Sequence, residues 1–176
     1  MDTVEITAGR LHLRPWLPRD AAEVQAICSD PVIARWTRVP EPYTAQDAAS
    51  YVGEVSPRGW DAGTDAHFAV LDATTGGVLA SVSLMGIGDG RAELGLWVGP
   101  QARGAGVGAD ASAAVCRWAF AELGLRRVAW LADVDNAASI RCAQKAGFVH
   151  EGVLRARLDV KGRVSDAWLG ARLATD

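Results

Sequence analysis

A glycine-rich segment restricts the possible folds of this chain more than any other feature, because it lies where a strand must pass into a long helix. Residues 101–108 read Gln-Ala-Arg-Gly-Ala-Gly-Val-Gly, with glycines at positions 104, 106 and 108. Residues 92–98 have the apolar pattern of a strand, and the alanine-rich residues 104–123 have that of a helix. This junction predicts a sheet that is crossed over by a helix.

The same segment predicts a binding site for an anion. Glycines leave main-chain N–H groups uncovered, and the first turn of a helix adds unpaired donors at the positive end of its dipole. A phosphate or diphosphate fits such a seat, and Arg103 can add a charge-assisted contact. An alternative is that the glycines only let the helix approach the strand closely. The binding residues predicted from the segment are Arg103, Gly104, Ala105, Gly106, Val107 and Gly108.

The surrounding pattern predicts a mixed α/β sheet with the element order β-α-α-β-β-β-α-β-α-β-β, in one domain that covers residues 1–176. Strands are expected at residues 11–15, 67–71, 78–87, 92–98, 127–133, 148–160 and 164–173. Helices are expected at residues 18–27, 44–55, 104–123 and 136–146, and Pro57 and Gly59 are expected to end the second of them. Residues 30–43 are punctuated by prolines and predict a loop that contains a helical turn.

Composition excludes several classes of protein. A net charge of −3 creates no field that would gather nucleic acid, and no apolar run approaches the length of a membrane span. The three cysteines, Cys28, Cys116 and Cys142, are widely spaced, so we expect reduced thiols and no metal site. The N-terminus has no signal-peptide pattern, which predicts a cytoplasmic location.

A dinucleotide-binding fold is the main competing interpretation of the glycine segment. Gly104-x-Gly106-x-x-Ala109 satisfies the fingerprint, and Asp133 ends the next strand where a ribose-binding acid would lie. That fold requires the glycine loop to follow the first strand of a βαβαβ array. Here the loop follows tight antiparallel turns, and only one helix remains after the one that it opens, so a doubly wound domain cannot be completed. A Walker A loop is excluded because no Gly-Lys-Ser/Thr follows.

Four motifs in order give the chain a resemblance to a known family. They are 10–15 (Arg-Leu-His-Leu-Arg-Pro), 93–100 (Glu-Leu-Gly-Leu-Trp-Val-Gly-Pro), Gln101-x-x-Gly104-x-Gly106, and Asn136-x-x-Ser139 followed by Lys-Ala-Gly-Phe at 145–148 and Glu-Gly-Val-Leu-Arg at 151–155. The chain resembles the GNAT superfamily of acyl-CoA-dependent N-acyltransferases, and most of all its RimJ/RimL-like branch. The similarity spans residues 9–173.

The resemblance implies a fold and a cofactor. The strand at 92–98 and the strand at 127–133 are expected to splay apart, with acetyl-CoA or another acyl-CoA in the gap. Main-chain N–H groups near a bulge at residues 97–99 would polarise the thioester carbonyl, and the amine would attack directly, without an acyl-enzyme. The cofactor-binding residues implied in addition to the glycine segment are Trp97, Val98, Gln101, Asn136 and Ser139.

The amine needs a base, because an ammonium group has no lone pair with which to attack. Strand alternation puts Glu93, Gly95 and Trp97 on one face, opposite an apolar face that should belong to the core. Glu93 is therefore the predicted catalytic base, with His150 and Glu151 as alternatives. The resemblance makes Ser139 the catalytic group that assists the departing thiolate, because Ala143 stands where many family members have a tyrosine.

Side chains that could contact the acceptor amine are Trp36, Trp60, His150 and Asp166. The two tryptophans lie in or beside the two-helix region that, in the family, walls the acceptor site, and Asp166 could bind a cationic substrate. The predicted activity is transfer of an acyl group, most simply acetyl, to a primary amine of a protein N-terminus, an amino acid or a small molecule. Succinyl transfer, a non-catalytic acyl-CoA sensor and a homodimer are further hypotheses.

Overall fold

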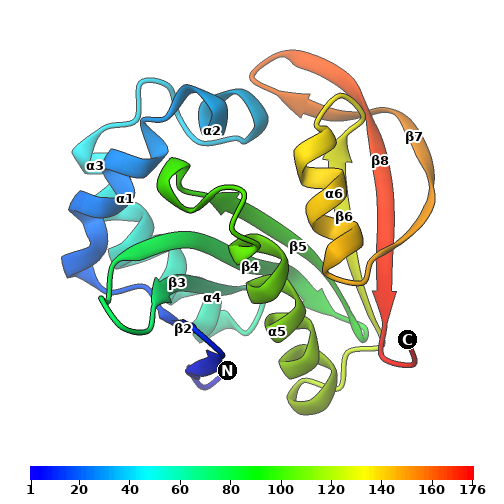
Figure 1. Cartoon of the computed structure of the whole chain (residues 1–176), viewed down its shortest axis with the longest axis horizontal. Coiled ribbons are helices and arrows are strands. Elements are labelled where there is room, and N and C mark those ends of the chain that lie inside the picture. Colours follow the sequence, from blue (N-terminus) through cyan, green and yellow to red (C-terminus); the bar gives the residue numbers. More distant parts are fainter.

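One mixed sheet of eight strands, in the order β1-β2-β3-β4-β5-β6-β8-β7, organises the computed structural model, which describes all residues 1–176 (Figure 1). Every neighbouring pair is antiparallel except β5 and β6, which run parallel. The predicted mixed α/β class is confirmed, and β1 is an additional strand. The strands are β1 Ile6–Ala8, β2 Leu11–Pro15, β3 Ala66–Asp72, β4 Val78–Gly88, β5 Arg91–Val98, β6 Arg127–Asp133, β7 Val149–Val160 and β8 Arg163–Leu173.

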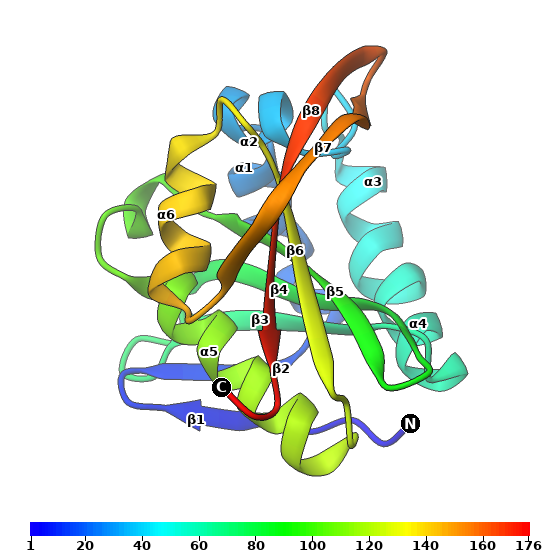
Figure 2. The same ribbon diagram turned by 90° about the vertical axis from the view of Figure 1, so that its right-hand side faces the viewer.

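Helices cover both faces of the sheet. The α-helices are α1 Ala21–Cys28, α2 Pro31–Trp36, α3 Ala45–Ser50, α4 Ser56–Ala62, α5 Val107–Glu122 and α6 Ala137–Lys145. Figure 2 shows α5 and α6 on one face, with α3 on the other. The core is divided accordingly into a large cluster beneath α5 and a smaller one beneath α1 and α3. None of the helices is both long and apolar enough to cross a membrane.

Alternation along β5 places its side chains as the sequence predicts. Leu94 belongs to the large cluster beneath α5, and the partly buried Leu96 and Val98 pack against that cluster. Trp97 packs against the smaller cluster beneath α1 and α3. Because successive side chains of a strand point to opposite faces, Glu93 lies on the face of Trp97.

The pairing of β5 with β6 ends after a few residues. Only Arg91, Ala92 and Glu93 pair with β6, and the last pair is Glu93 with Ala129. Beyond it, β5 stays paired with β4, whereas β6 stays paired with β8 through to Asp133. The two strands therefore diverge toward their C-terminal ends, which confirms the predicted splay (Figure 1).

The bulge expected at residues 97–99 is not found. The register of β4 with β5 is uninterrupted from Ala80 opposite Val98 to Met85 opposite Glu93, and Gly99 N–H continues it by donating to Leu79 at 2.8 Å. The shift in register lies between Met85 and Gly88, beside the tight turn. The expectation was wrong because a local irregularity of a strand depends on its partner as well as on its own sequence.

Three helix boundaries also differ from the prediction. Pro57 does not end the second helix, because it lies in the first turn of α4, after a π-helical turn at Tyr51–Val55, where its missing N–H costs little. The helical turn predicted within residues 30–43 is a short helix, α2, at residues 31–36, capped by the carboxylate of Asp30. Helix α5 begins at Val107, not at residue 104, because Gly104 and Gly106 have positive φ angles of 77° and 80°.

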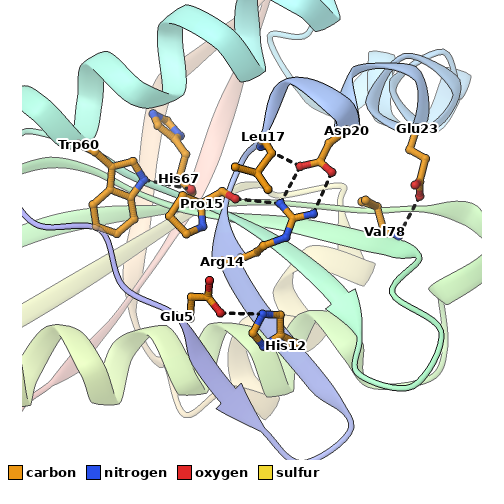
Figure 3. Close-up of polar contacts among 10 residues, drawn as sticks. All are labelled: Glu5, His12, Arg14, Pro15, Leu17, Asp20, Glu23, Trp60, His67 and Val78. Carbon is orange, nitrogen blue, oxygen red and sulfur yellow. Dashed lines mark hydrogen bonds and ion pairs between the residues drawn. The ribbon is translucent and has the colours of Figure 1, made fainter.

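Buried polar contacts fix the N-terminal helices to the sheet (Figure 3). Arg14 of β2 makes a two-pronged contact with Asp20, at 2.7 and 2.8 Å, and both side chains are buried. Burial by itself would raise the pKa of Asp20, but the hydrogen bonds from Arg14 and from Leu17 N–H lower it overall. Glu23 of α1 accepts from Val78 N–H at 2.9 Å, which joins α1 to β4. These contacts position the helices that flank β5.

Candidate active site

The glycine loop at residues 103–106 presents main-chain donors to solvent. Gly104, Ala105 and Gly106 are exposed, and none of their N–H groups donates to another group of the protein. A side chain at Gly104 would meet no atom within 4 Å, so the space over the loop is open. The first N–H groups of α5 follow directly. The loop therefore has the free donors and the room that an anion requires.

Gly108 has a different role from the two glycines before it. It is buried, and a Cβ there would lie 3.0 Å from the sulfur of Cys142 and 3.1 Å from side-chain atoms of Leu96 and Val98. This glycine lets α5 pack closely on α6 and β5. Val107 is also buried, in the large core cluster. Because both residues are buried, they can contribute to ligand binding only through their main-chain N–H groups.

Gln101 and Arg103 hold the loop in place. Gln101 Nε2 donates to the carbonyl oxygen of Val78 at 3.0 Å, which joins the loop to β4. Arg103 donates through Nη2 to Asp30 Oδ1 at 2.7 Å and through Nε to the carbonyl oxygen of Val98 at 3.3 Å. The hydrogen bond from Arg103 lowers the pKa of Asp30. The predicted anion contact of Arg103 thus competes with an ion pair within the protein.

Arg10 is a residue at this loop that the sequence did not indicate as functional. It lies in the turn between β1 and β2, and its Nη2 donates to the carbonyl oxygen of Ala105. The two residues are 95 positions apart, so no local pattern could join them. Arg10 brings a second cation beside the free N–H groups of the loop.

The open edge of β5 lines the splay. Gly99 bonds to β4, so alternation along an antiparallel ladder turns the main-chain groups of Val98 and Leu96 away from β4, toward the gap. Glu93 lies at the closed end of this gap, where pairing with β6 stops. Its side chain is half-buried, and its carboxylate has no hydrogen-bond or ion-pair partner within the protein. A free carboxylate at this place can accept a proton from a group in the gap.

Asn136 and Ser139 form the first turn of α6, next to β6. Asn136 caps the helix, because its Oδ1 accepts from Ser139 N–H at 3.1 Å. Ser139 Oγ accepts from the indole Nε1 of Trp130 at 3.0 Å. Both residues are half-buried. The side-chain nitrogen of Asn136 has no partner within the protein and keeps free donors.

The three thiols are poor nucleophiles in this fold. Burial raises the pKa of Cys28 and of Cys116 to about 12 and that of Cys142 to about 11. A thiol attacks as its thiolate, which these pKa values make scarce at neutral pH. The arrangement therefore favours direct attack by an amine over an acyl-cysteine intermediate.

The prediction that Trp60 lines an acceptor surface is wrong. Only 1% of Trp60 is exposed, and its Nε1 donates to the carbonyl oxygen of His67 at 3.2 Å. Its ring packs edge-on against Phe68 and also contacts Trp118 of α5. Trp60 therefore serves the core, with its one polar atom satisfied.

Trp36 lies where two distant parts of the chain meet. The guanidinium of Arg35 lies 4.6 Å from its ring centroid, and that of Arg163 lies 5.3 Å away. Lys161, in the turn of the β7–β8 hairpin, donates to the carbonyl oxygen of Ala34 at 2.7 Å. The hairpin tip thus contacts α2, at the top of Figure 1. Trp36 is half-buried and keeps a surface that a substrate can reach.

The two other predicted acceptor residues have partners of their own. His150 is exposed on β7, the outermost strand, so β8 and β6 separate it from the splay. Its ring stacks on Trp168 with centroids 5.4 Å apart. Asp166 accepts from Ala156 N–H at 2.8 Å and thereby supports the irregular part of the hairpin. The geometry does not bring His150 to the gap.

The structure argues against Glu151 as the catalytic base and against Asp133 as the ribose-binding residue of a dinucleotide site. Glu151 forms an ion pair with Arg127, with the shorter of its two contacts at 2.5 Å, and this hydrogen bonding lowers the pKa of Glu151. Asp133, the ribose-binding candidate, is buried and accepts from Arg163 at 2.7 Å and Ser165 at 2.6 Å. No group of three or more His, Cys, Asp or Glu side chains is placed to hold a metal ion.

Comparisons with known proteins define the class. Residues 10–149 match the model of the Acetyltransferase (GNAT) domain. The chain therefore belongs to the GNAT family, and it is an acetyltransferase. It is 26% identical over 166 residues to an uncharacterized N-acetyltransferase, p20, of Bacillus licheniformis, covering 91% of this chain and 90% of that relative.

Solved structures share the fold at lower identity. The fold is similar to that of Mycobacterium smegmatis RimJ in complex with CoA-disulfide, with a TM-score of 0.86 and 22% identity over 99% of this chain and 87% of that one. It is also similar to RimL, a ribosomal L7/L12 alpha-N-protein acetyltransferase in complex with coenzyme A. There the TM-score is 0.88 and the identity 18%, over 97% of this chain and 98% of the other. The predicted resemblance is confirmed.

Proposed function

We propose that this acetyltransferase binds acetyl-CoA at the glycine loop and transfers the acetyl group directly to the primary amine of a protein or peptide N-terminus. The observation that carries the proposal is the row of free N–H groups at Gly104, Ala105 and Gly106, at the head of α5 and beside the splay. The diphosphate of the coenzyme occupies these donors. Arg10 and Arg103 add positive charge at the same place.

The rest of the cofactor follows the open edge of β5. The amide groups of the pantetheine arm bond to the main chain at Leu96 and Val98, as an additional strand would. Trp97 belongs to this wall, and Asn136 supplies its free side-chain donors from the opposite side of the gap. The thioester then lies between β5 and the first turn of α6. No bulge is needed for the donors to face it, because regular alternation already turns them that way.

The chemical step is attack of a neutral amine on the thioester carbonyl. Glu93 takes a proton from the amine, directly or through water, while the carbon–nitrogen bond forms and the carbon–sulfur bond breaks. The sulfur leaves as a thiolate and accepts a hydrogen bond from Ser139. Two observations support this role for Glu93: it lies at the closed end of the gap, and its carboxylate has no partner within the protein.

An α-amine is the acceptor that the chemistry favours. Its pKa of about 8, against about 10.4 for lysine, leaves a larger neutral fraction at physiological pH. The name of the structural relative RimL, an alpha-N-protein acetyltransferase, supports the same class. Trp36 and Asp166 then contact the acceptor near the hairpin tip. A cytoplasmic location and a homodimer stay predictions.

An acceptor screen tests the proposal. Binding of acetyl-CoA is measured by calorimetry, and turnover is followed by release of free thiol. Three acceptors are compared: a peptide with a free α-amine, the same peptide blocked at its N-terminus but containing lysine, and a small primary amine. We expect turnover with the first. Affinity without any turnover would favour a sensor, a preference for succinyl-CoA would change the donor, and absence of acyl-CoA binding would refute the proposal.

A further inference from the structure

The hydrogen bond between Trp130 and Ser139 has a direction that the chemistry of the two side chains dictates. An indole N–H can only donate, so Ser139 Oγ must be the acceptor in the 3.0 Å contact. Ser139 has no other side-chain partner within the protein. Its own O–H proton is therefore not used in holding the serine in place and remains available to a ligand.

The surroundings fix both partners of this bond. Trp130 is 2% exposed, and its ring packs edge-on against Phe148 with centroids 5.2 Å apart. Ser139 is held at its main chain by the Asn136 cap. Because the indole is buried against Phe148 and the first turn of α6 is capped, the serine oxygen has one favoured position. Its remaining lone pair and its proton face away from Trp130.

We propose that Trp130 is a positioning residue, whose N–H holds Ser139 Oγ so that the serine O–H is directed at the sulfur of the departing coenzyme A thiolate. The inference rests on the proposed function. The inference adds to that function a residue that does not contact the substrate. An O–H group that accepts a hydrogen bond also becomes a better hydrogen-bond donor, because successive hydrogen bonds polarise one another. The amine proton still goes to the base, and Ser139 keeps its own proton while it stabilises the thiolate.

A double-mutant cycle tests the inference. Trp130→Phe keeps an aromatic ring and removes the N–H. Trp118→Phe makes the same change at a half-buried tryptophan of α5, whose ring lies against Trp60 and Phe68. We expect Trp130→Phe to lower kcat about tenfold, the scale of one hydrogen bond, with the KM for acetyl-CoA changed less than twofold. Trp118→Phe should keep kcat. In a Ser139→Ala background, Trp130→Phe should have no further effect on kcat.

Two results for Trp130→Phe would overturn the inference, and a second variant covers a failure to fold. If Trp130→Phe lowers kcat by the same factor with and without Ser139, Trp130 does not act through the serine. If Trp130→Phe retains full kcat, the N–H is dispensable. If Trp130→Phe does not fold, benzothienylalanine at position 130 keeps the shape of the double ring without the N–H and should reproduce the tenfold loss. If wild-type protein binds no acetyl-CoA, the proposed function fails before the inference is reached.

Discussion

The guanidinium of Arg103 lies 2.7 Å from the carboxylate of Asp30, and this ion pair joins the glycine loop to the first turn of α2. Asp30 also caps α2, because its Oδ1 accepts from Val32 and Ile33 N–H. The same carboxylate oxygen therefore accepts hydrogen bonds from the first turn of α2 and from the arginine. The proposed binding of coenzyme A at the loop therefore implies a competition with Asp30 for Arg103.

That competition predicts opposite effects for changes at the two residues. Arg103→Gln should raise the Kd for acetyl-CoA about tenfold, because a charge-assisted hydrogen bond to the diphosphate is lost. Asp30→Asn keeps a capping oxygen but removes the competing charge, so the Kd should stay equal or fall. Calorimetric titration of both variants measures this. An increase in Kd for Asp30→Asn as large as that for Arg103→Gln would mean that the ion pair matters only for the fold.

The glycines of the loop should separate binding from stability. Gly104→Ala adds a methyl group in open space at a φ of 77°, which costs about 1 kcal/mol of strain and moves the N–H groups. We expect weaker acetyl-CoA binding and a small loss of stability. Titration and denaturant unfolding on the same samples measure the two effects.

Gly108→Ala is the matched control for that change. Its methyl group would press on Cys142, Leu96 and Val98 at 3.0–3.1 Å. Overpacking of this kind costs about 1–3 kcal/mol of unfolding free energy, so Gly108→Ala should destabilise the protein more than Gly104→Ala does. If Gly104→Ala binds acetyl-CoA as tightly as wild type, the loop is not the diphosphate site.

The parts of the site that the sequence predicts correctly depend on local patterns. Alternation of apolar residues along β5 was enough to place Leu94 in the core and Glu93 on the opposite face. Glycines before an alanine-rich helix were enough to place the loop with its free N–H groups. The antiparallel pairing of neighbouring strands followed from short turns, and the splay followed from the family resemblance.

The parts that the sequence could not predict depend on packing between distant segments. Trp60 follows Pro57 and Gly59, a pattern that predicts a loop, yet α4 places its ring in the core against Phe68. Arg103 meets Asp30 across 73 positions. The hydrogen bond from Trp130 to Ser139 requires β6 and α6 to lie side by side at a given height. The spacing of residues along the sequence does not predict such long-range contacts.

Glu93 should be needed for the chemical step and not for cofactor binding. Glu93→Gln removes the proton acceptor but keeps the shape of the side chain, so kcat should fall about 100- to 10,000-fold, while the Kd for acetyl-CoA stays within twofold. Stopped-flow or steady-state thiol release gives kcat, and calorimetry gives the Kd. Glu151→Gln serves as the control, because Glu151 is paired with Arg127 and should leave kcat unchanged. A large loss of kcat in Glu151→Gln alone would exchange the two assignments.

His67 should make the protein less stable in mild acid. Its Nδ1 lies 2.8 Å from Ser83 Oγ, and burial lowers the pKa of His67, an effect that Asp65 only partly opposes. Above pH 6.5 the ring is neutral in both folded and unfolded chains, so its titration has no effect on stability there. As pH falls below about 6.5, the unfolded chain takes up a proton that the folded chain does not. The free energy of unfolding should then decrease by up to about 1.4 kcal/mol per pH unit until the folded pKa is reached.

Denaturant unfolding between pH 7.5 and pH 5 tests this dependence on His67. The lowered pKa values of carboxylates such as Asp20 and Asp133 act in a separate window, because their stabilisation is present above the unfolded pKa of about 4 and is lost only below it. His67→Asn keeps a polar partner for Ser83 and removes the titrating ring, so its stability should be nearly independent of pH in this range. His150→Asn, at an exposed histidine, should retain the wild-type dependence. An unchanged slope in His67→Asn would show that the buried ring is not the group responsible.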